Sequence, residues 1–251
     1  MLRFKILPRF VIAIFLSFML FTVIGTLSHE WGHIAVANYF GYTTTLSYGS
    51  MGYTQDFSED REVQEIKRLS DPYDDLDYDE WPADVKIKLE ALDKIVMERY
   101  PYNETYKLHD KLITLGGPAQ TLLTSGIGVL LLFLRRKKWR VKFMTLDWLA
   151  VFMVLFALRE VFNFILASYE ALFYSQSNFH GDEFKISRDL GFNEWMIPTL
   201  ALVIGLLISC YVIFKIIPLS YRFSFILAGG LGSVAGYAMW FGFLGPAVFN
   251  W

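Results

Sequence analysis

The feature that most constrains this chain is a set of long apolar segments with few formal charges. The first, residues 10–28, has 19 residues without a formal charge. At a rise of about 1.5 Å per residue, it nearly crosses a hydrocarbon core of about 30 Å. We expect it to continue as a helix to about Tyr39. Four later segments share this character, and they are residues 112–134, 143–169, 196–214 and 223–251. The pattern predicts an all-α polytopic membrane protein with about five transmembrane helices.

Composition supports a membrane protein with one water-facing part. Hydrophobic residues make up 54% of the chain and charged residues only 19%, which is too apolar for an ordinary soluble domain. Residues 51–110 differ, because they hold 17 acidic and 8 basic side chains. We therefore expect an acidic soluble insert between the first and second spans. This charge balance argues against nucleic acid as a partner and gives no indication of oligomeric state.

The predicted spans divide the chain into three parts. Residues 1–41 form an N-terminal segment and the first transmembrane helix, residues 42–110 the insert, and residues 111–251 the remaining four helices. Within the insert, residues 42–48 are rich in β-branched and aromatic side chains and are followed by glycines, which predicts a small β-hairpin. Residues 83–99 have the apolar spacing of a helix, so the insert is expected to be partly helical.

Basic side chains gather in three clusters outside the insert. These are at residues 3–9, 135–142 and 215–222. With five spans all three fall on one side of the membrane, and the positive-inside rule makes that side cytoplasmic. The insert is then expected outside.

The most informative motif is His29-Glu30-Trp31-Gly32-His33. On a helix, side chains at i and i+4 share a face, so both imidazoles can bind one zinc ion, while the glutamate between them can take a proton from a water. The motif lies in the first predicted span, where ionisable groups are costly and indicate a functional site. The spacing therefore predicts a metal site at membrane depth.

Three motifs together resemble the site-2 protease family of intramembrane zinc metallopeptidases. Besides the His-Glu motif, Gly116-Gly117-Pro118 resembles the family's Gly-Pro motif within its second span. The segment Gly181-Asp182-Glu183 and the residues after it are similar to the family's Leu-Asp-Gly segment, although a glutamate replaces the glycine. The resemblance extends over roughly residues 10–214, and the acidic insert has no counterpart in it.

This resemblance implies one Zn²⁺ per chain, held by His29, His33 and Asp182, with Glu30 as general base. It implies an integral, multi-pass protein of the bacterial inner membrane that hydrolyses peptide bonds in or next to transmembrane segments of its substrates. The residues alone leave the third ligand open. The competing candidates are His180, Glu183, Glu170 and Glu160, of which His180 is chemically the best because imidazole suits zinc.

Two sets of residues are expected to contact the substrate. Many family members carry Asn three residues after the Pro of the Gly-Pro motif, and this chain has Gln120 and Thr121 there. The strand-forming segment 42–48 offers an edge to which an extended substrate could add, with Thr44 and Leu46 as its binding positions. An ordinary covering hairpin is the alternative for this segment.

Other features have structural interpretations or leave alternatives open. Arg159 and Glu160 of the third predicted span are expected to form an ion pair that holds helices together, with a role in water or proton access as the alternative. Gly232 and Gly236 are expected to form a face for close helix packing. The orientation is contested, because the motif helix of family members runs the opposite way. Two rival functions also remain, namely a metallopeptidase acting on soluble or lipoprotein substrates at the membrane surface and a non-catalytic zinc-binding membrane protein.

Overall fold

The computed structural model describes residues 4–54, 60–73, 78–99, 104–173, 179 and 181–249. Within these residues, five helical segments are long and apolar enough to cross a membrane. They are Pro8–Tyr39, Thr105–Leu134, Thr145–Phe173, Met196–Ile216 and Leu219–Phe249. The prediction of an all-α polytopic membrane protein with a small β-hairpin is confirmed.

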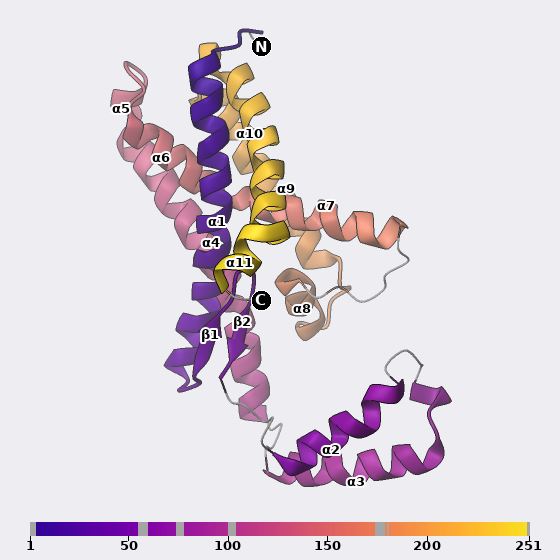
Figure 1. Cartoon of the computed structure of the whole chain (residues 1–251). Helices are drawn as coiled ribbons and strands as arrows, with labels where there is room; N and C mark the ends of the chain where they lie inside the picture. The colour runs from indigo at the N-terminus through magenta and orange to yellow at the C-terminus, as the bar shows by residue number, and fades with distance from the viewer. Residues whose placement is uncertain are drawn as a thin grey trace.

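The spans are built from ten helical elements and turns among the described residues (Figure 1). In chain order these are α1 (Pro8–Tyr39), α4 (Glu104–Leu134), α6 (Thr145–Val154), the 3-10 turn η4 (Leu155–Ala157), α7 (Leu158–Phe173), α9 (Met196–Tyr211), the π-helical turn η5 (Val212–Ile216), α10 (Leu219–Met239), the π-helical turn η6 (Trp240–Leu244) and α11 (Gly245–Phe249). Helix α4 begins within the residues that the sequence assigned to the insert.

The elements outside the spans are short. They are β1 (Thr44–Leu46), β2 (Met51–Tyr53), α2 (Arg61–Ser70), the 3-10 turns η2 (Asp71–Tyr73) and η3 (Tyr78–Glu80), α3 (Ala83–Arg99), α5 (Arg136–Trp139) and α8 (Asp182–Asp189). Helix α3 has the predicted bounds. The two strands fall within and just after the segment predicted to form strands.

Helix α1 runs through the molecule as a single rod. Its 32 residues give a length of about 48 Å, so it carries its last turns well beyond the apolar run. Pro8 lies in its first turn, where the missing N–H has no helical partner to lose. The helix stops before Gly41, whose φ of 86° is a left-handed conformation that glycine adopts without strain.

Close packing of α1 against α10 depends on small residues, as predicted (Figure 1). A Cβ added at Gly232 would lie 2.6 Å from the carbonyl oxygen of Phe15. One added at Gly236 would lie 2.8 Å from Cα of Met19. The absence of side chains at both positions lets the two backbones approach, which is how helices associate in a medium that offers no hydrophobic driving force.

Three helices begin at the same end of the bundle. The backbone N–H of Leu7 donates to Oγ of Ser224 at 3.0 Å. The ring of Phe10 packs against Trp148 and Tyr221, with centroids 5.0 and 4.8 Å apart. The starts of α1, α6 and α10 are therefore neighbours, and the basic clusters near them share one end of the molecule. The cytoplasmic location of that end stays a prediction.

The third span is not one straight helix. Helix α6 ends at Val154, the turn η4 follows, and α7 leaves in a different direction, roughly across the long axis of α1 (Figure 1). Gly205 of α9 packs against this turn, since a Cβ there would lie 2.6 Å from the carbonyl oxygen of Ala157. Arg159 and Glu160 lie in the first turn of α7, directly after this break.

The hairpin lies against the C-terminal end of α1. Strands β1 and β2 are antiparallel, with Thr44 opposite Tyr53 and Leu46 opposite Met51. Trp240 of η6 donates its indole N–H to the carbonyl oxygen of Tyr48 at 2.7 Å, which attaches the hairpin to the end of α10.

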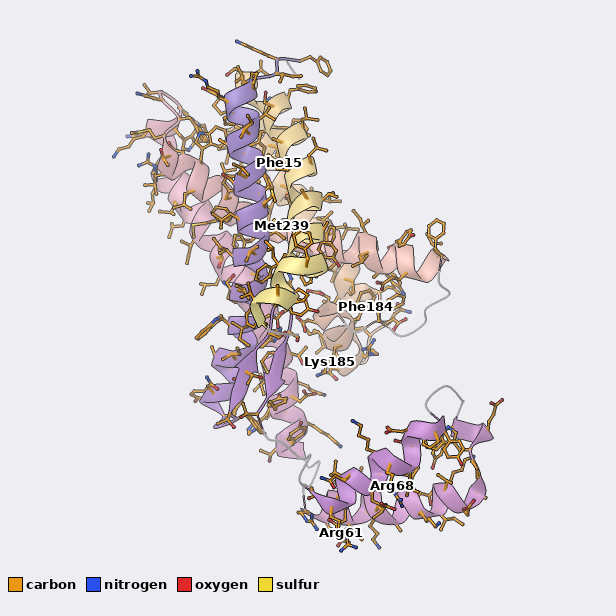
Figure 2. All side chains as sticks on the ribbon, in the orientation of Figure 1. Phe15, Arg61, Arg68, Phe184, Lys185 and Met239 are labelled. Atoms are coloured by element: carbon orange, nitrogen blue, oxygen red, sulfur yellow. The ribbon has the colours of Figure 1, made fainter. Side chains whose placement is uncertain are left out.

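The acidic insert forms a pair of helices, α2 and α3, which pack on each other (Figure 1). Asp60 caps α2 by accepting from the backbone N–H of Glu62 and Val63. Arg99 of α3 bonds to Asp60 and Glu62, so the end of one helix is fixed to the start of the other. Arg61 and Arg68 project from α2 (Figure 2). The pair contains no residue of the site described below.

Candidate metal centre

Two buried histidines of α1 face one carboxylate. His29 and His33 are one helical turn apart, and both are less than a tenth exposed. Their Nε2 atoms lie 2.8 and 3.1 Å from the same oxygen, Oδ2 of Asp182. Among the described residues, these three side chains form the one group of His, Cys, Asp or Glu that could hold a metal ion. Their donor atoms all lie within 4.8 Å of one another.

The carboxylate reaches the histidines because α8 is fixed to its neighbours. Asp182 is the first residue of α8, after the capping residue Gly181. Lys185 bonds to Asp110 of α4 at 2.9 Å, and Phe184 is buried in an aromatic cluster against α7 (Figure 2). This short helix is thus held both by an ion pair and by packing.

Of the competing third ligands, the structure brings none of the described ones into this group. Glu183 is buried and its side chain bonds to Glu160 of α7. Glu170 lines the cavity beside the site and is not part of the cluster. His180 lies outside the described residues.

The far side of each imidazole ring is held by α4. Nδ1 of His29 lies 3.0 Å from Oγ1 of Thr121, and Nδ1 of His33 lies 2.7 Å from the carbonyl oxygen of Ile113. The backbone N–H of Gly117 lies 3.3 Å from the same nitrogen of His33. A carbonyl only accepts, so the shorter contact with Ile113 places the proton on Nδ1. The lone pair of Nε2 is then directed towards Asp182. Outer hydrogen bonds of this kind orient histidines that bind metals.

The donor set fits a zinc ion. Two imidazole nitrogens and one carboxylate oxygen are ligands typical of catalytic zinc, which keeps a fourth position for water or substrate. Ligand bonds of about 2.0–2.1 Å in a tetrahedron place donor atoms about 3.3 Å apart, close to the distances of 2.8 and 3.1 Å between Asp182 and the two rings. Burial raises the pKa of the Asp182 carboxyl, but the imidazoles beside it outweigh this effect and hold the pKa below its usual range. The carboxyl is therefore ionised and able to bind a cation.

Glycines bring the two helices of the site together. A Cβ at Gly32 would collide with the backbone of Gly116, and one at Gly116 would collide with that of Gly32. A Cβ at Gly117 would collide with Nε2 of both His29 and His33. The Gly-Gly-Pro motif therefore leaves the space that the histidine nitrogens occupy, and the glycine inside the His-Glu motif belongs to the same crossing.

Glu30 is beside the cluster and is not part of it. Its carboxylate is buried and accepts a hydrogen bond from the backbone of Met51 in β2. Oε1 lies 4.0 Å from Nη2 of Arg159 in α7. The expected pairing of Arg159 with Glu160 is therefore wrong in its partner. Consecutive side chains of a helix point in different directions, and here Arg159 faces Glu30 while Glu160 faces Glu183.

A cavity of about 510 Å³ opens beside the site, and we call it the site cavity. Glu30, His33 and Asp182 line it together with residues of β2, α4, α7 and α8. Tyr53 of β2 is at its wall, and burial raises the pKa of this phenol to about 12, so it stays a hydrogen-bond donor. Glu30, His33 and Asp182 are therefore reached from one side, through this cavity.

The residues expected to contact substrate have other neighbours. Thr121 holds His29, and Gln120 donates to Oγ1 of Thr124 at 2.9 Å. Thr44 and Leu46 lie in β1 and are absent from the described lining of the site cavity, where β2 contributes Met51 and Tyr53 instead. Their role in substrate binding stays a prediction, now with β2 as the strand nearest the site.

The sequence indicated some site residues but not their roles. Arg159 and Asn163 are four residues apart on α7 and both line the site cavity. Charged and amide side chains one turn apart in an apolar segment are a signal for a shared polar face. The roles of Gly32 and Met51 have no comparable local signal, because they depend on which helix or carboxylate lies opposite.

Comparison of this chain with protein-family models, with curated proteins and with solved structures found no match. The resemblance to site-2 proteases therefore depends on the three sequence motifs alone.

Proposed function

We propose that this protein is a membrane-embedded zinc metalloendopeptidase of the bacterial inner membrane, which hydrolyses peptide bonds in or next to transmembrane segments of other proteins. One observation carries the proposal. Glu30 lies between the two histidines in sequence and beside the cluster in space, but it is not one of the three grouped donors. A site that only stores or senses a metal has no use for such a base.

The chain's own groups account for the proton transfers of hydrolysis. When bound, zinc would supply a Lewis acid that activates water and polarises the scissile carbonyl. Glu30 takes a proton from the attacking water at its carboxylate oxygen and delivers it to the leaving nitrogen as the C–N bond breaks. Arg159 is 4.0 Å from Glu30 and offers N–H donors towards the same side of the cavity.

Strand β2 offers the substrate backbone a partner. The backbone N–H of Ser47 donates to the carbonyl of Ser50, and that of Thr54 donates to the carbonyl of Thr43. Hydrogen-bonded and non-hydrogen-bonded residue pairs alternate along an antiparallel ladder. The pairs formed by Met51 and Tyr53 with β1 are therefore non-hydrogen-bonded. The backbone groups of Met51 and Tyr53 thus point away from β1. The N–H of Met51 bonds to Glu30 there, and the carbonyl of Met51 and the backbone groups of Tyr53 face the same edge. A helical peptide bond must be unwound before it can be attacked, and its freed backbone groups need partners at membrane depth. An extended substrate beside β2 would find them.

The test compares wild type with Glu30→Gln, using casein and a synthetic transmembrane peptide as substrates for detergent-purified protein. The amide is nearly isosteric and cannot act as a base, so we expect zinc content to stay and cleavage to fall by about 100- to 10,000-fold. Glu65→Gln on exposed α2 is the matched control and should cleave normally. Cleavage by Glu30→Gln at the wild-type rate would contradict the proposal.

Two alternatives predict different results in the same assay. A surface metallopeptidase would cleave casein and leave the transmembrane peptide intact. A non-catalytic zinc protein would cleave neither, and its zinc content would be unaffected by Glu30→Gln. Hydrolysis of the transmembrane peptide that requires Glu30 is expected only from the proposed enzyme.

A further inference from the structure

A second cavity, of about 290 Å³, lies beside the site cavity, and we call it the apolar cavity. Its walls come mainly from three helical segments far apart in the sequence, namely α1, the bent third span and α10 with η6, and Gly49 of the hairpin completes them. Aromatic rings dominate the lining, and they include Phe18, Phe21, Phe156, Phe162 and Phe241. The metal-binding cluster has no residue in it.

The two cavities meet at shared residues. Gly49 of the hairpin and Arg159, Asn163 and Leu166 of α7 line both. Arg159 also contacts the carboxylate of Glu30 at 4.0 Å. The mouth of the apolar cavity is therefore next to Glu30, the residue that we assign as general base.

The polar side chains where the two cavities meet indicate what kind of molecule enters the apolar cavity. Nε of Arg159 is buried and finds no hydrogen-bond partner within the described part of the chain. A guanidinium and an amide at membrane depth are costly, and an acyl chain of a lipid would satisfy neither. The backbone of a peptide offers carbonyl oxygens that would.

The size of the apolar cavity indicates which side chains it can hold. A buried apolar cavity of about 150 Å³ is known to bind benzene. At about 290 Å³, this one has room for a phenylalanine or leucine side chain and for part of its backbone.

We propose that the apolar cavity is a specificity pocket for a large apolar side chain, aromatic or leucine-sized, on a residue next to the scissile bond. Arg159 and Asn163 contact the backbone carbonyls at its mouth. This inference rests on the proposed peptidase function and adds the class of substrate residue that the site selects.

Helix α10 supplies a matched pair of variants. Ser233 lines the apolar cavity, whereas its neighbour Val234 is 66% exposed on the outside of the bundle. In Ser233→Phe the new ring fills the pocket, and in Val234→Phe the same ring points away. Neither residue belongs to the metal-binding or proton-transfer machinery.

The first measurement is the distribution of cleavage sites in synthetic transmembrane peptides whose central residues are Phe, Leu, Met, Ala or Gly, mapped by mass spectrometry. Wild type and Val234→Phe are expected to cleave beside Phe, Leu and Met. Ser233→Phe should lose at least about tenfold in rate at these sites relative to sites flanked by Ala or Gly, with zinc content and thermal stability near wild type. An unchanged preference in Ser233→Phe, or an equal loss at all sites, would overturn the inference.

The second measurement does not require catalysis. A transmembrane peptide carrying benzoyl-phenylalanine at its centre is photo-crosslinked to Glu30→Gln protein. We expect adducts on α10 and η6, and their loss when Ser233→Phe is added. Crosslinks confined to the lipid-facing surface would refute the pocket. Adducts in the pocket without cleavage by the wild type would instead contradict the proposed function and leave the pocket supported.

Discussion

The two ends of helix α1 use the same residue, glycine, for different purposes. Near its N-terminal end, Gly232 and Gly236 of α10 admit the backbone of α1 into an aromatic core built around Phe18 and Phe225. Near its C-terminal end, Gly32 and Gly116 bring α1 and α4 into contact where His29 and His33 meet Asp182. The first crossing packs apolar side chains into a core, whereas the second positions the donor atoms of the candidate metal site.

The comparison shows that a close helix crossing can either stabilise the fold or position chemical groups. Glycine-to-alanine substitutions at the two crossings should distinguish these two roles. At the α1–α10 crossing, a methyl group added at Gly232 or Gly236 meets backbone and side-chain atoms of α1. At the α1–α4 crossing, a methyl group added at Gly117 meets the imidazoles themselves. The first change should lower stability and leave zinc binding intact, and the second should do the reverse.

The largest effect is expected for Gly117→Ala. Its methyl group would collide with Nε2 of both histidines, so at least one ring must leave its position. We expect zinc to be lost and cleavage to fall by more than about 100-fold, as measured by metal analysis and a peptide assay. Gly126→Ala on the same helix is the control, because its methyl group meets nothing within 4 Å. Full zinc content in Gly117→Ala would count against this geometry.

A smaller effect is expected for Thr121→Val. This nearly isosteric change removes the oxygen that lies 3.0 Å from Nδ1 of His29 and leaves the ring in place but less firmly oriented. Outer partners of metal-binding histidines typically contribute about 10- to 100-fold in affinity. Zinc competition with a chelator should reveal a loss in that range. Thr124→Val, one turn further along α4, should bind zinc as the wild type does, and equal affinities in both variants would exclude the orienting role.

The smallest effect on the site is expected for Gly232→Ala. Its methyl group would lie 2.6 Å from the carbonyl oxygen of Phe15, and overpacking of this kind costs about 1–3 kcal/mol of stability. Thermal unfolding should begin at lower temperature than in Gly230→Ala, whose methyl group meets nothing within 4 Å. Zinc content should be the same in both. Loss of zinc from Gly232→Ala would show that the two crossings are coupled.

The same contrast explains how much the sequence could predict. Length and apolarity determine a span locally, so all five spans and the helix carrying His29 and His33 could be identified from the chain. The i and i+4 spacing placed both rings on one face because helical geometry is invariant. Asp182 lies 149 residues beyond His33, and it was identified only by resemblance to a family motif.

Features that depend on the opposite surface could not be predicted. Arg159 and Glu160 are neighbours on α7, and only the positions of the other helices show that Arg159 faces Glu30 and that Glu160 faces Glu183. Likewise, the strand propensity of residues 42–48 indicated a hairpin, but not that β2 would line the site cavity rather than β1. Such choices are made by tertiary packing, which overrides local preference.

The most direct test of the central claim is the zinc content of purified protein, measured per chain by elemental analysis. We predict one zinc ion in wild type and in Glu30→Gln, and none in Asp182→Ala, because removing the carboxylate leaves only the two imidazoles to hold the ion. Asp189→Ala, at the other end of α8, is the control and should keep one ion. Full zinc content in Asp182→Ala, or its loss in Glu30→Gln, would contradict the assignment of ligands and base.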